Sequence, residues 1–519
     1  MEKTRGGFSP VSLVRRRQFS AIILFALAFA IAYSQSPLFT SNQNQYFLHG
    51  MALAGVGNLQ KDWLANTADP TPVFSYLVAF IYKIFRFPTV FYLIYLGILV
   101  VYFLSCSGIA RKISNLNYPF ASFLFFVLFT LIHSTAFRYF LTILLGPDWA
   151  YIFEGGLAGQ RILGTVFQPS SFGVLLILSV YLFLIRKNYL AVTLSVLAAV
   201  FHPTYLLPAA TLISAYMWSA YKDEEKVHSA IWLGLFALIL VLPILGYVIP
   251  TFWPSSPEEY ARSQEILVHF RIPHHAVITE WLDGSAMIQF VLVILATFLT
   301  RKSKLYPIFV FGLSVSFILT MIQTITGNNA LALLFPWRIS SILVPLATTV
   351  LLARLIEAAF GRWKSWFEAH SALLLISGIV VVLSMMAAGI FYFVQEYMDK
   401  VNSSESGLFH YIAIKKRAED NYLIPIDMQD FRLATGAAVY VDFKSIPYQD
   451  QEVLEWHRRV LQVSDFYRKN RINCENLREW TVAEHITHLI LMSDRKDPDC
   501  SFLEEIHRNQ NFRLFKFAD

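Results

Sequence analysis

Long apolar runs, separated by short polar connections, fill the chain as far as about residue 398. A helix needs about 20 largely apolar residues to cross the hydrocarbon of a membrane, because no backbone group can be left unpaired there. The pattern therefore predicts a polytopic α-helical membrane protein with about 11 transmembrane helices. The predicted spans are residues 18–36, 89–109, 117–135, 169–185, 188–202, 204–221, 229–250, 285–300, 305–325, 337–358 and 371–395.

Basic residues orient these spans, because Lys and Arg gather in the cytoplasmic connections of membrane proteins. With a cytoplasmic N-terminus and a retained first span, every predicted inner connection is basic. The inner connections are all basic only if the segment from Val73 to Phe85, which Arg86 follows, does not cross the membrane. We therefore expect this segment to form a helix lying along the outer membrane surface. The inner basic residues are Lys3, Arg5, Arg15, Arg16, Arg17, Arg111, Lys112, Arg186, Lys187, Lys222, Lys226, Arg301, Lys302, Lys304, Arg354, Arg362 and Lys364.

The predicted outer segments are longer and mixed in charge, and we expect function on that side. They are residues 37–88, 136–168, 251–284 and 326–336. An odd number of spans also places the tail outside. The expected domains are a transmembrane domain at residues 1–398, with its first outer loop at 37–88, and a small extracytoplasmic α/β domain at 399–519.

The tail has the composition of a soluble domain. Residues 422–426, 438–443, 488–493 and 512–517 are predicted strands, and residues 450–469 and 501–509 are predicted helices. Alternating strands and helices favour a small α/β domain. The tail contains no glycine-rich phosphate loop and no G-x-S-x-G motif, so we expect a structural or substrate-capping role.

Composition supports the membrane assignment: of 519 residues, 56% are hydrophobic and only 15% are charged. The net charge of +6 does not indicate nucleic-acid binding, because the basic residues occupy short clusters between apolar runs. Cys106 lies in a predicted span, whereas Cys474 and Cys500 lie in the tail. An extracytoplasmic tail would allow the latter two to form a disulfide, and the alternative is two free thiols.

Asp62 and Asp69 in the first outer loop are the candidate catalytic residues. A carboxylate beside a membrane, in a partly dry cavity, can accept a proton from a hydroxyl or hold a divalent cation. Either use suits transfer of a sugar from a lipid carrier. The alternative is structural: Asp62 would cap a short helix, and Asp69 would begin a turn before Pro70.

Arginines near the outer membrane edge are the candidate phosphate-binding residues. Arg161 lies in a glycine-rich apolar stretch and Arg338 lies near the outer end of a span, where an unpaired guanidinium is costly. The planar guanidinium matches a lipid phosphate, although Glu154 is an alternative partner and arginines also snorkel at interfaces. Arg138 is a weaker third case. Gln168 is assigned to substrate binding in the same region as Arg161.

A histidine-containing loop, VHFRIPHHAVI at residues 268–278, supplies further candidates. Arg271 with His274 or His275 could contact a pyrophosphate or act as acid and base. The metal signal is weak, and an exposed polar loop is the alternative. His202 follows a predicted span and is expected either to line the same cavity or to end that helix.

This arrangement of a first span, an acidic outer loop, a surface helix, many spans and an outer α/β domain resembles the GT-C superfamily of membrane glycosyltransferases. That superfamily uses polyprenyl-phosphate sugars and includes protein O-mannosyltransferases and aminoarabinose transferases acting on lipid A. The resemblance implies that Asp62 is the catalytic base or a cation ligand, and that Arg161 and Arg338 hold the donor phosphate. The chain lacks the acidic pair of that loop and the Trp-Trp-Asp-Tyr-Gly signature of oligosaccharyltransferases. The chain also resembles a group of bacterial polytopic membrane proteins in the segments DWLANTADPTPVFS, FQPSSFG, FRIPHH and AVYVDFKSIPYQDQEVLEWHRR. This second resemblance implies no particular reaction.

The sequence therefore predicts an inverting glycosyltransferase of the bacterial inner (plasma) membrane that acts on the outer side. Its expected partners are a polyprenyl-phosphate-linked sugar and membrane lipid, with no nucleic acid, and a divalent cation is its only candidate cofactor. Two alternatives remain open, a transporter or flippase for a lipid-linked saccharide and a non-catalytic scaffold for envelope assembly. A transporter is less favoured, because the predicted spans contain few charges and the sequence shows no internal repeat.

Overall fold

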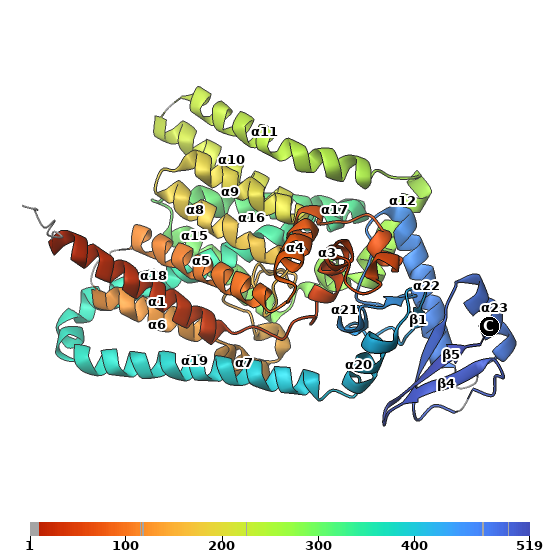
Figure 1. Cartoon of the computed structure of the whole chain (residues 1–519). Helices are drawn as coiled ribbons and strands as arrows, with labels where there is room; N and C mark the ends of the chain where they lie inside the picture. The colour runs from red at the N-terminus through yellow and green to blue at the C-terminus, as the bar shows by residue number, and fades with distance from the viewer. Residues whose placement is uncertain are drawn as a thin grey trace, which may run out of the picture.

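The computed structural model of the chain describes residues 10–114, 116, 119–224, 226–469, 472–496 and 498–518. Lys3 and Arg5, which were predicted to lie on the inner side, are outside these residues. Within them the protein consists of a bundle of long helices and a smaller C-terminal domain with a sheet (Figure 1).

Each predicted span is largely helical in the structure. The long helices run side by side, and the C-terminal domain lies at one end of the bundle (Figure 1). The helices are α1 (Pro10–Tyr33), α5 (Val90–Ile113), α6 (Pro119–His133), η4 (Pro169–Gly173) with α8 (Val174–Leu184), α9 (Asn188–Phe201), α10 (Leu206–Glu224), α11 (Val227–Thr251), α15 (Gly284–Leu299), α16 (Leu305–Thr326), α18 (Ser340–Ala369) and α19 (Ser371–Val401).

Length and apolarity support membrane crossing for part of this set. Among the described residues, five helices are long and apolar enough to cross, and a sixth crossing results if α6 and α7 (Thr135–Leu145), bent by 49°, form one span. On α11 an apolar face with Ile231, Leu238 and Leu242 is at least half exposed. Such a face is unfavourable in water and suits contact with lipid. The protein is thus consistent with a helical membrane protein, and the count of 11 stays a prediction.

Short helices connect the long ones at the end of the bundle that faces the C-terminal domain. The segment predicted as a surface helix is the 14-residue helix α4 (Pro72–Phe85), which packs on α3 and α9 and leaves Tyr76 and Phe80 exposed. The other short elements are α2 (Gln43–Tyr46), α3 (Leu48–Ala54), η1 (Leu59–Lys61), η2 (Leu64–Asn66), η3 (Pro147–Trp149), η5 (Pro203–Tyr205), α12 (Pro257–Glu265), η6 (Ile266–Arg271), α13 (Pro273–Ala276), α14 (Ile278–Trp281), α17 (Asn329–Leu333) and η7 (Pro336–Ile339).

The C-terminal domain is a mixed α/β structure with a five-stranded sheet in the order β2-β1-β3-β5-β4. Strands β2, β1 and β3 are parallel, whereas β5 is antiparallel to both β3 and β4. Its elements are α20 (Ser406–Lys415), β1 (Asn421–Leu423), α21 (Phe431–Thr435), β2 (Ala438–Val439), α22 (Asp450–Arg468), α23 (Cys474–Ala483), β3 (His488–Met492), β4 (Leu503–Arg508) and β5 (Phe512–Phe517). The four predicted strands are present, and so is the helix predicted at residues 450–469.

The helix predicted at residues 501–509 is wrong, because this segment forms the edge strand β4. Leu503 pairs with Phe517 and Arg508 pairs with Arg513, with an irregular register between Glu505 and His507. A six-residue segment with two adjacent glutamates has weak preferences of its own, so pairing with β5 decides its structure. The polar edge and its bulge also discourage pairing with another chain.

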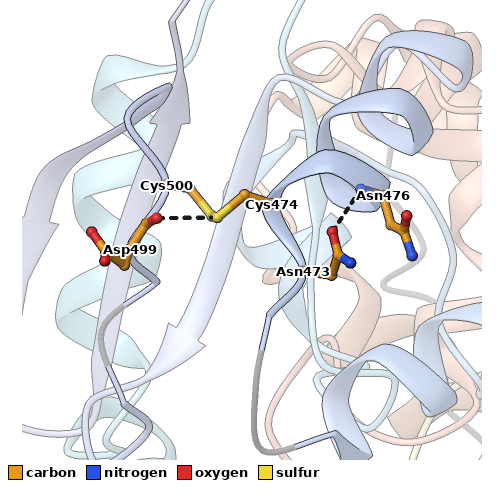
Figure 2. The surroundings of a disulfide bond; sticks show 5 residues. All are labelled: Asn473, Cys474, Asn476, Asp499 and Cys500. Atoms are coloured by element: carbon orange, nitrogen blue, oxygen red, sulfur yellow. Dashed lines mark hydrogen bonds between the residues drawn. A yellow bond between two sulfur atoms is a disulfide. The ribbon is translucent and has the colours of Figure 1, made fainter.

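Of the two alternatives for the tail cysteines, the structure has the disulfide between Cys474 and Cys500. Figure 2 shows that it joins the first residue of α23 to the segment just before β4. Asn473 precedes Cys474 and caps α23, because its side-chain oxygen accepts a hydrogen bond from the Asn476 amide at 3.1 Å. The bond closes a loop with a sequence separation of 26 residues, and Cys106 is a buried free thiol.

Candidate functional site

The largest cavity described, about 840 Å³, lies between the end of the bundle and the C-terminal domain. All four segments predicted to lie outside contribute to its wall, and the turn between β2 and α22 completes it with Lys444, Ile446 and Tyr448. Its size is in the range that holds a small-molecule ligand. Seven of the eight predicted substrate-binding residues line it: Arg161, Gln168, His202, Arg271, His274, His275 and Arg338.

Arg161 and Arg338 come from the bundle side of this cavity. The Arg161 guanidinium is exposed and lies 4.1 Å from the centre of the Tyr151 ring. The Arg338 guanidinium lies 4.8 Å from the Tyr205 ring centre and donates a hydrogen bond to the Gln160 side-chain oxygen. Aromatic faces hold these planar cations in position without neutralising their charge.

Arg271 and Lys444 form a second cationic pair, which joins η6 to the C-terminal domain. Arg271 Nη2 donates a hydrogen bond of 2.7 Å to the Lys444 carbonyl oxygen, and its guanidinium lies 5.1 Å from the Phe443 ring centre. The pKa of Lys444 is lowered to about 8, mainly by burial and secondly by the positive charge of Arg271. None of the four cavity cations forms an ion pair with a carboxylate among the described residues.

His274 and His275 lie side by side, with ring centres 4.1 Å apart. His275 Nδ1 lies 2.6 Å from the Ala158 carbonyl oxygen, so this nitrogen carries the proton and Nε2 is left as an acceptor. Burial, followed by His274, lowers the pKa of His275 to about 3. Both rings are therefore neutral at physiological pH. The charges that act on them are positive, from Arg161, Arg271, Arg338 and Lys444.

Carboxylates occupy another part of the wall. Asp148 in η3, Glu280 in α14 and Asp283 before α15 all line the cavity and are exposed. Asp283 caps α15 by accepting from the Ala286 amide at 2.8 Å. No hydrogen bond or ion pair holds the side chain of Asp148 or Glu280 within the part of the chain that the structure describes. The carboxylates of these two acids are open to accept a proton from a ligand.

Asp62 does not face this cavity, so its predicted placement is wrong. Its side chain is completely buried at the contact between the first outer loop and the C-terminal domain. One carboxylate oxygen accepts hydrogen bonds from Arg432 Nε at 2.7 Å and the Val439 amide at 2.9 Å, and the other accepts from the Leu64 amide at 2.9 Å. The acid is surrounded by donors from its own protein, which leaves no room for a substrate hydroxyl or a cation.

Asp69 also lies outside the cavity lining, although its neighbours Pro70 and Thr71 belong to it. Its side chain accepts a hydrogen bond from the Thr71 amide at 2.8 Å, which fixes the turn before α4. Its carbonyl oxygen accepts a hydrogen bond from the Tyr247 hydroxyl at 2.8 Å. The structural alternative given for Asp69, a turn-forming residue, matches this geometry.

Arg138 is the predicted substrate-binding residue that the cavity does not include. Its side chain is buried and donates to Glu154 at 3.2 Å and to the Tyr33 carbonyl oxygen at 2.6 Å. Burial raises the pKa of Glu154 to about 7, although the positive charge of Arg138 acts to lower it. Arg138 therefore stabilises the packing of α7 against α1, and Glu154 pairs with it rather than with Arg161.

Sequence reasoning did not identify Lys444 and Asp148 as site residues. Lys444 lies in a domain that carries no binding motif, and only the docking of that domain brings it to the cavity. Asp148 is an isolated acid between Pro147 and Trp149, and it was overlooked because the first outer loop was expected to supply the acids. Its position in a Pro-containing outer connection was the available signal.

A metal site is not evident: among the described residues, no three His, Cys, Asp or Glu side chains cluster in a way that could hold an ion. A family model described as a domain of unknown function (DUF6798) matches residues 404–463, the first half of the C-terminal domain. Curated proteins give no match to the chain. The matched segment contains Arg432 and Lys444, so both the Asp62 contact and part of the cavity belong to it.

Proposed function

We propose that this protein is a membrane glycosyltransferase that moves a sugar from a polyprenyl-phosphate donor to an acceptor on the outer face of a bacterial plasma membrane. The observation that carries the proposal is the cavity itself, in which four cations without carboxylate partners among the described residues share one chamber with two acids whose side chains have no partner there either. Cations of this kind suit a phosphate, and free carboxylates suit proton abstraction from a hydroxyl.

In this proposal the cations act on the leaving group. The acceptor oxygen forms a bond to the anomeric carbon while the bond from that carbon to the phosphate oxygen breaks. The electron pair stays on the lipid phosphate, where Arg161 and Arg338 stabilise the developing charge. The acceptor proton passes to Asp148 or Glu280. This assignment replaces Asp62, which is buried and fully hydrogen-bonded.

Two features support the outer location. The disulfide between Cys474 and Cys500 suits an oxidising compartment. The basic connections predicted to be cytoplasmic, such as Arg301 to Lys304, follow the opposite ends of the helices that carry the cavity segments. Membership of the GT-C superfamily and the count of 11 crossings belong to this proposal.

The test is sugar transfer by the purified protein supplied with polyprenyl-phosphate sugars and an acceptor mixture. We expect either Asp148→Asn or Glu280→Gln to lower the transfer rate by about 10² to 10⁴, the usual contribution of a general base. Asp69→Asn is the matched control, because this acid lies beside the cavity without lining it, and it should retain the wild-type rate.

Transfer that persists in the double variant Asp148→Asn/Glu280→Gln would exclude both acids as the base. Binding of lipid phosphate without any transfer would favour the transporter alternative. Full function after loss of the cavity arginines, combined with loss of function on deleting residues 399–519, would favour the scaffold.

A further inference from the structure

The four cations of the cavity form two separate pairs. Arg161 and Arg338 belong to the bundle, and Gln160, next to Arg161 in sequence, binds the Arg338 guanidinium. Arg271 and Lys444 belong to η6 and the C-terminal domain, and the bond from Arg271 Nη2 to the Lys444 carbonyl oxygen fixes them together. Arg271 and Lys444 are therefore joined by a direct contact, whereas Arg338 is linked to Arg161 through the neighbouring Gln160.

Two uncharged histidines, His274 and His275, line the same cavity as these pairs. The charged groups acting on His274 are Arg271 and Lys444, whereas those acting on His275 include Arg338 and Arg161. The two rings are 4.1 Å apart, so cations of both pairs act on one short stretch of wall. Because the rings are uncharged, they neutralise neither pair.

Two acids outside the cavity lining act on these cations, and both have partners among the described residues. Asp442, which acts on both Arg271 and Lys444, shares the single Arg432 with Asp62, so its cluster offsets only part of the charge of this pair. Glu154, which Arg161 influences, pairs with Arg138. A single phosphate can neutralise one cationic pair and leaves the other bare, and cations without a counter-charge in a partly buried site are costly. Two adjacent anionic groups match the arrangement better.

We infer that the ligand of this site carries a diphosphate, with one phosphate at Arg161 and Arg338 and the other at Arg271 and Lys444. The inference rests on the proposed function, whose donor it narrows from a lipid phosphate to a lipid diphosphate. The C-terminal domain then does more than cover the cavity, because its Lys444 distinguishes a diphosphate from a monophosphate.

The test compares binding of polyprenyl monophosphate, polyprenyl diphosphate and a nucleoside diphosphate to the full-length protein in lipid nanodiscs. We expect the wild type to bind the lipid diphosphate at least about tenfold more tightly than the lipid monophosphate, which corresponds to one additional charge-assisted contact. The nucleoside diphosphate tests whether the diphosphate belongs to a lipid or to a soluble molecule. We expect it to bind more weakly than the lipid diphosphate.

Lys444→Met should remove the preference for diphosphate while changing monophosphate affinity less than about twofold. The bond from Arg271 survives in this variant, because it ends on the backbone carbonyl of residue 444. Arg161→Gln should weaken binding of both lipids. Lys469→Met, an exposed lysine of the same domain that pairs with Asp465, is the matched control and should bind like the wild type.

Equal affinities of the wild type for the two lipids would overturn the inference and leave the proposed function standing. Equal loss of both affinities in Lys444→Met would also overturn it, because Lys444 would then act on any phosphate. Tighter binding of the nucleoside diphosphate than of either lipid would replace the lipid carrier with a soluble donor. Binding of none of the three would overturn the proposed function together with the inference.

Discussion

At the scale of single residues, Asp62 is a structural acid in a buried charge cluster. It shares Arg432 with Asp442, and all three side chains are at most 2% exposed. Two carboxylates and one guanidinium leave a net negative charge. Backbone amides of Leu64 and Val439 offset part of that charge by donating to Asp62. The cluster joins the first outer loop to the C-terminal domain.

The net charge of this cluster predicts unequal effects of substitution. Arg432→Met leaves two buried carboxylates without a counter-charge and should lower the free energy of unfolding by about 3–5 kcal/mol. Asp62→Asn keeps the ion pair between Arg432 and Asp442. It should lower the free energy of unfolding less, by about 1–3 kcal/mol, because only the hydrogen bonds of residue 62 are weakened. Denaturant unfolding of the purified variants measures both. Equal losses would show that the charge balance does not decide the cost.

Lys444 predicts a pH dependence of ligand binding. Its folded-state pKa is lowered to about 8, chiefly by burial, so its positive charge is present below pH 8 and is lost as the pH rises through that value. Affinity for a lipid diphosphate should therefore decrease between about pH 7 and 9.5. Binding isotherms across this range check it. Lys444→Arg, whose guanidinium stays charged, should remove most of the decrease, and an unchanged decrease in that variant would exclude Lys444 as its source.

At the scale of elements, the sheet of the C-terminal domain depends on partners remote in sequence. β4 is a strand because β5 pairs with it, and the disulfide fixes the segment before β4 to the start of α23. A cross-link acts mainly by restricting the unfolded chain, and its effect increases slowly with the length of the closed loop.

Removal of this disulfide should therefore destabilise the C-terminal domain. We expect the double variant Cys474→Ser/Cys500→Ser to lower the free energy of unfolding by about 3 kcal/mol, given the separation of 26 residues. Thermal unfolding with and without reductant measures the effect. Reductant should shift the wild type towards the variant and leave the variant unchanged, whereas a shift in the variant would point to another cause, since Cys106 is buried.

At the scale of the whole molecule, carboxylates of the C-terminal domain bind the connecting loops of the bundle. Glu452 accepts hydrogen bonds from the Ala68 amide at 3.0 and 3.1 Å, and Asp450 accepts from Ser255 at 2.7 Å. The two backbones also approach closely at Gly57, where a Cβ atom would lie 2.3 Å from the Gly436 oxygen. These contacts hold the turn that carries Lys444 over the cavity.

The proposed orientation is open to a direct test. We expect a membrane-impermeant maleimide applied to intact cells to label Ser404→Cys, which adjoins the C-terminal domain. Lys302→Cys, in the predicted cytoplasmic connection between α15 and α16, should react only after the membrane is permeabilised. The opposite pattern would invert every outer and inner assignment made from the basic residues.

Hydrophobic periodicity and turn residues act locally, and the sequence by itself was therefore enough to predict the helical segments, most strands of the tail and the residue types of the site. It pointed to Arg161 and Arg338, because charged groups in apolar surroundings need a reason to be there, and to Arg271 and the histidine pair, because they share one polar outer loop. Only the tertiary structure decided which acids matter, since burial and partners depend on contacts across hundreds of residues. Asp62 meets Arg432, 370 positions away, and becomes a structural contact. Docking of the C-terminal domain brings Lys444 to the cavity, while Asp148 and Glu280 lie on the bundle side with free carboxylates.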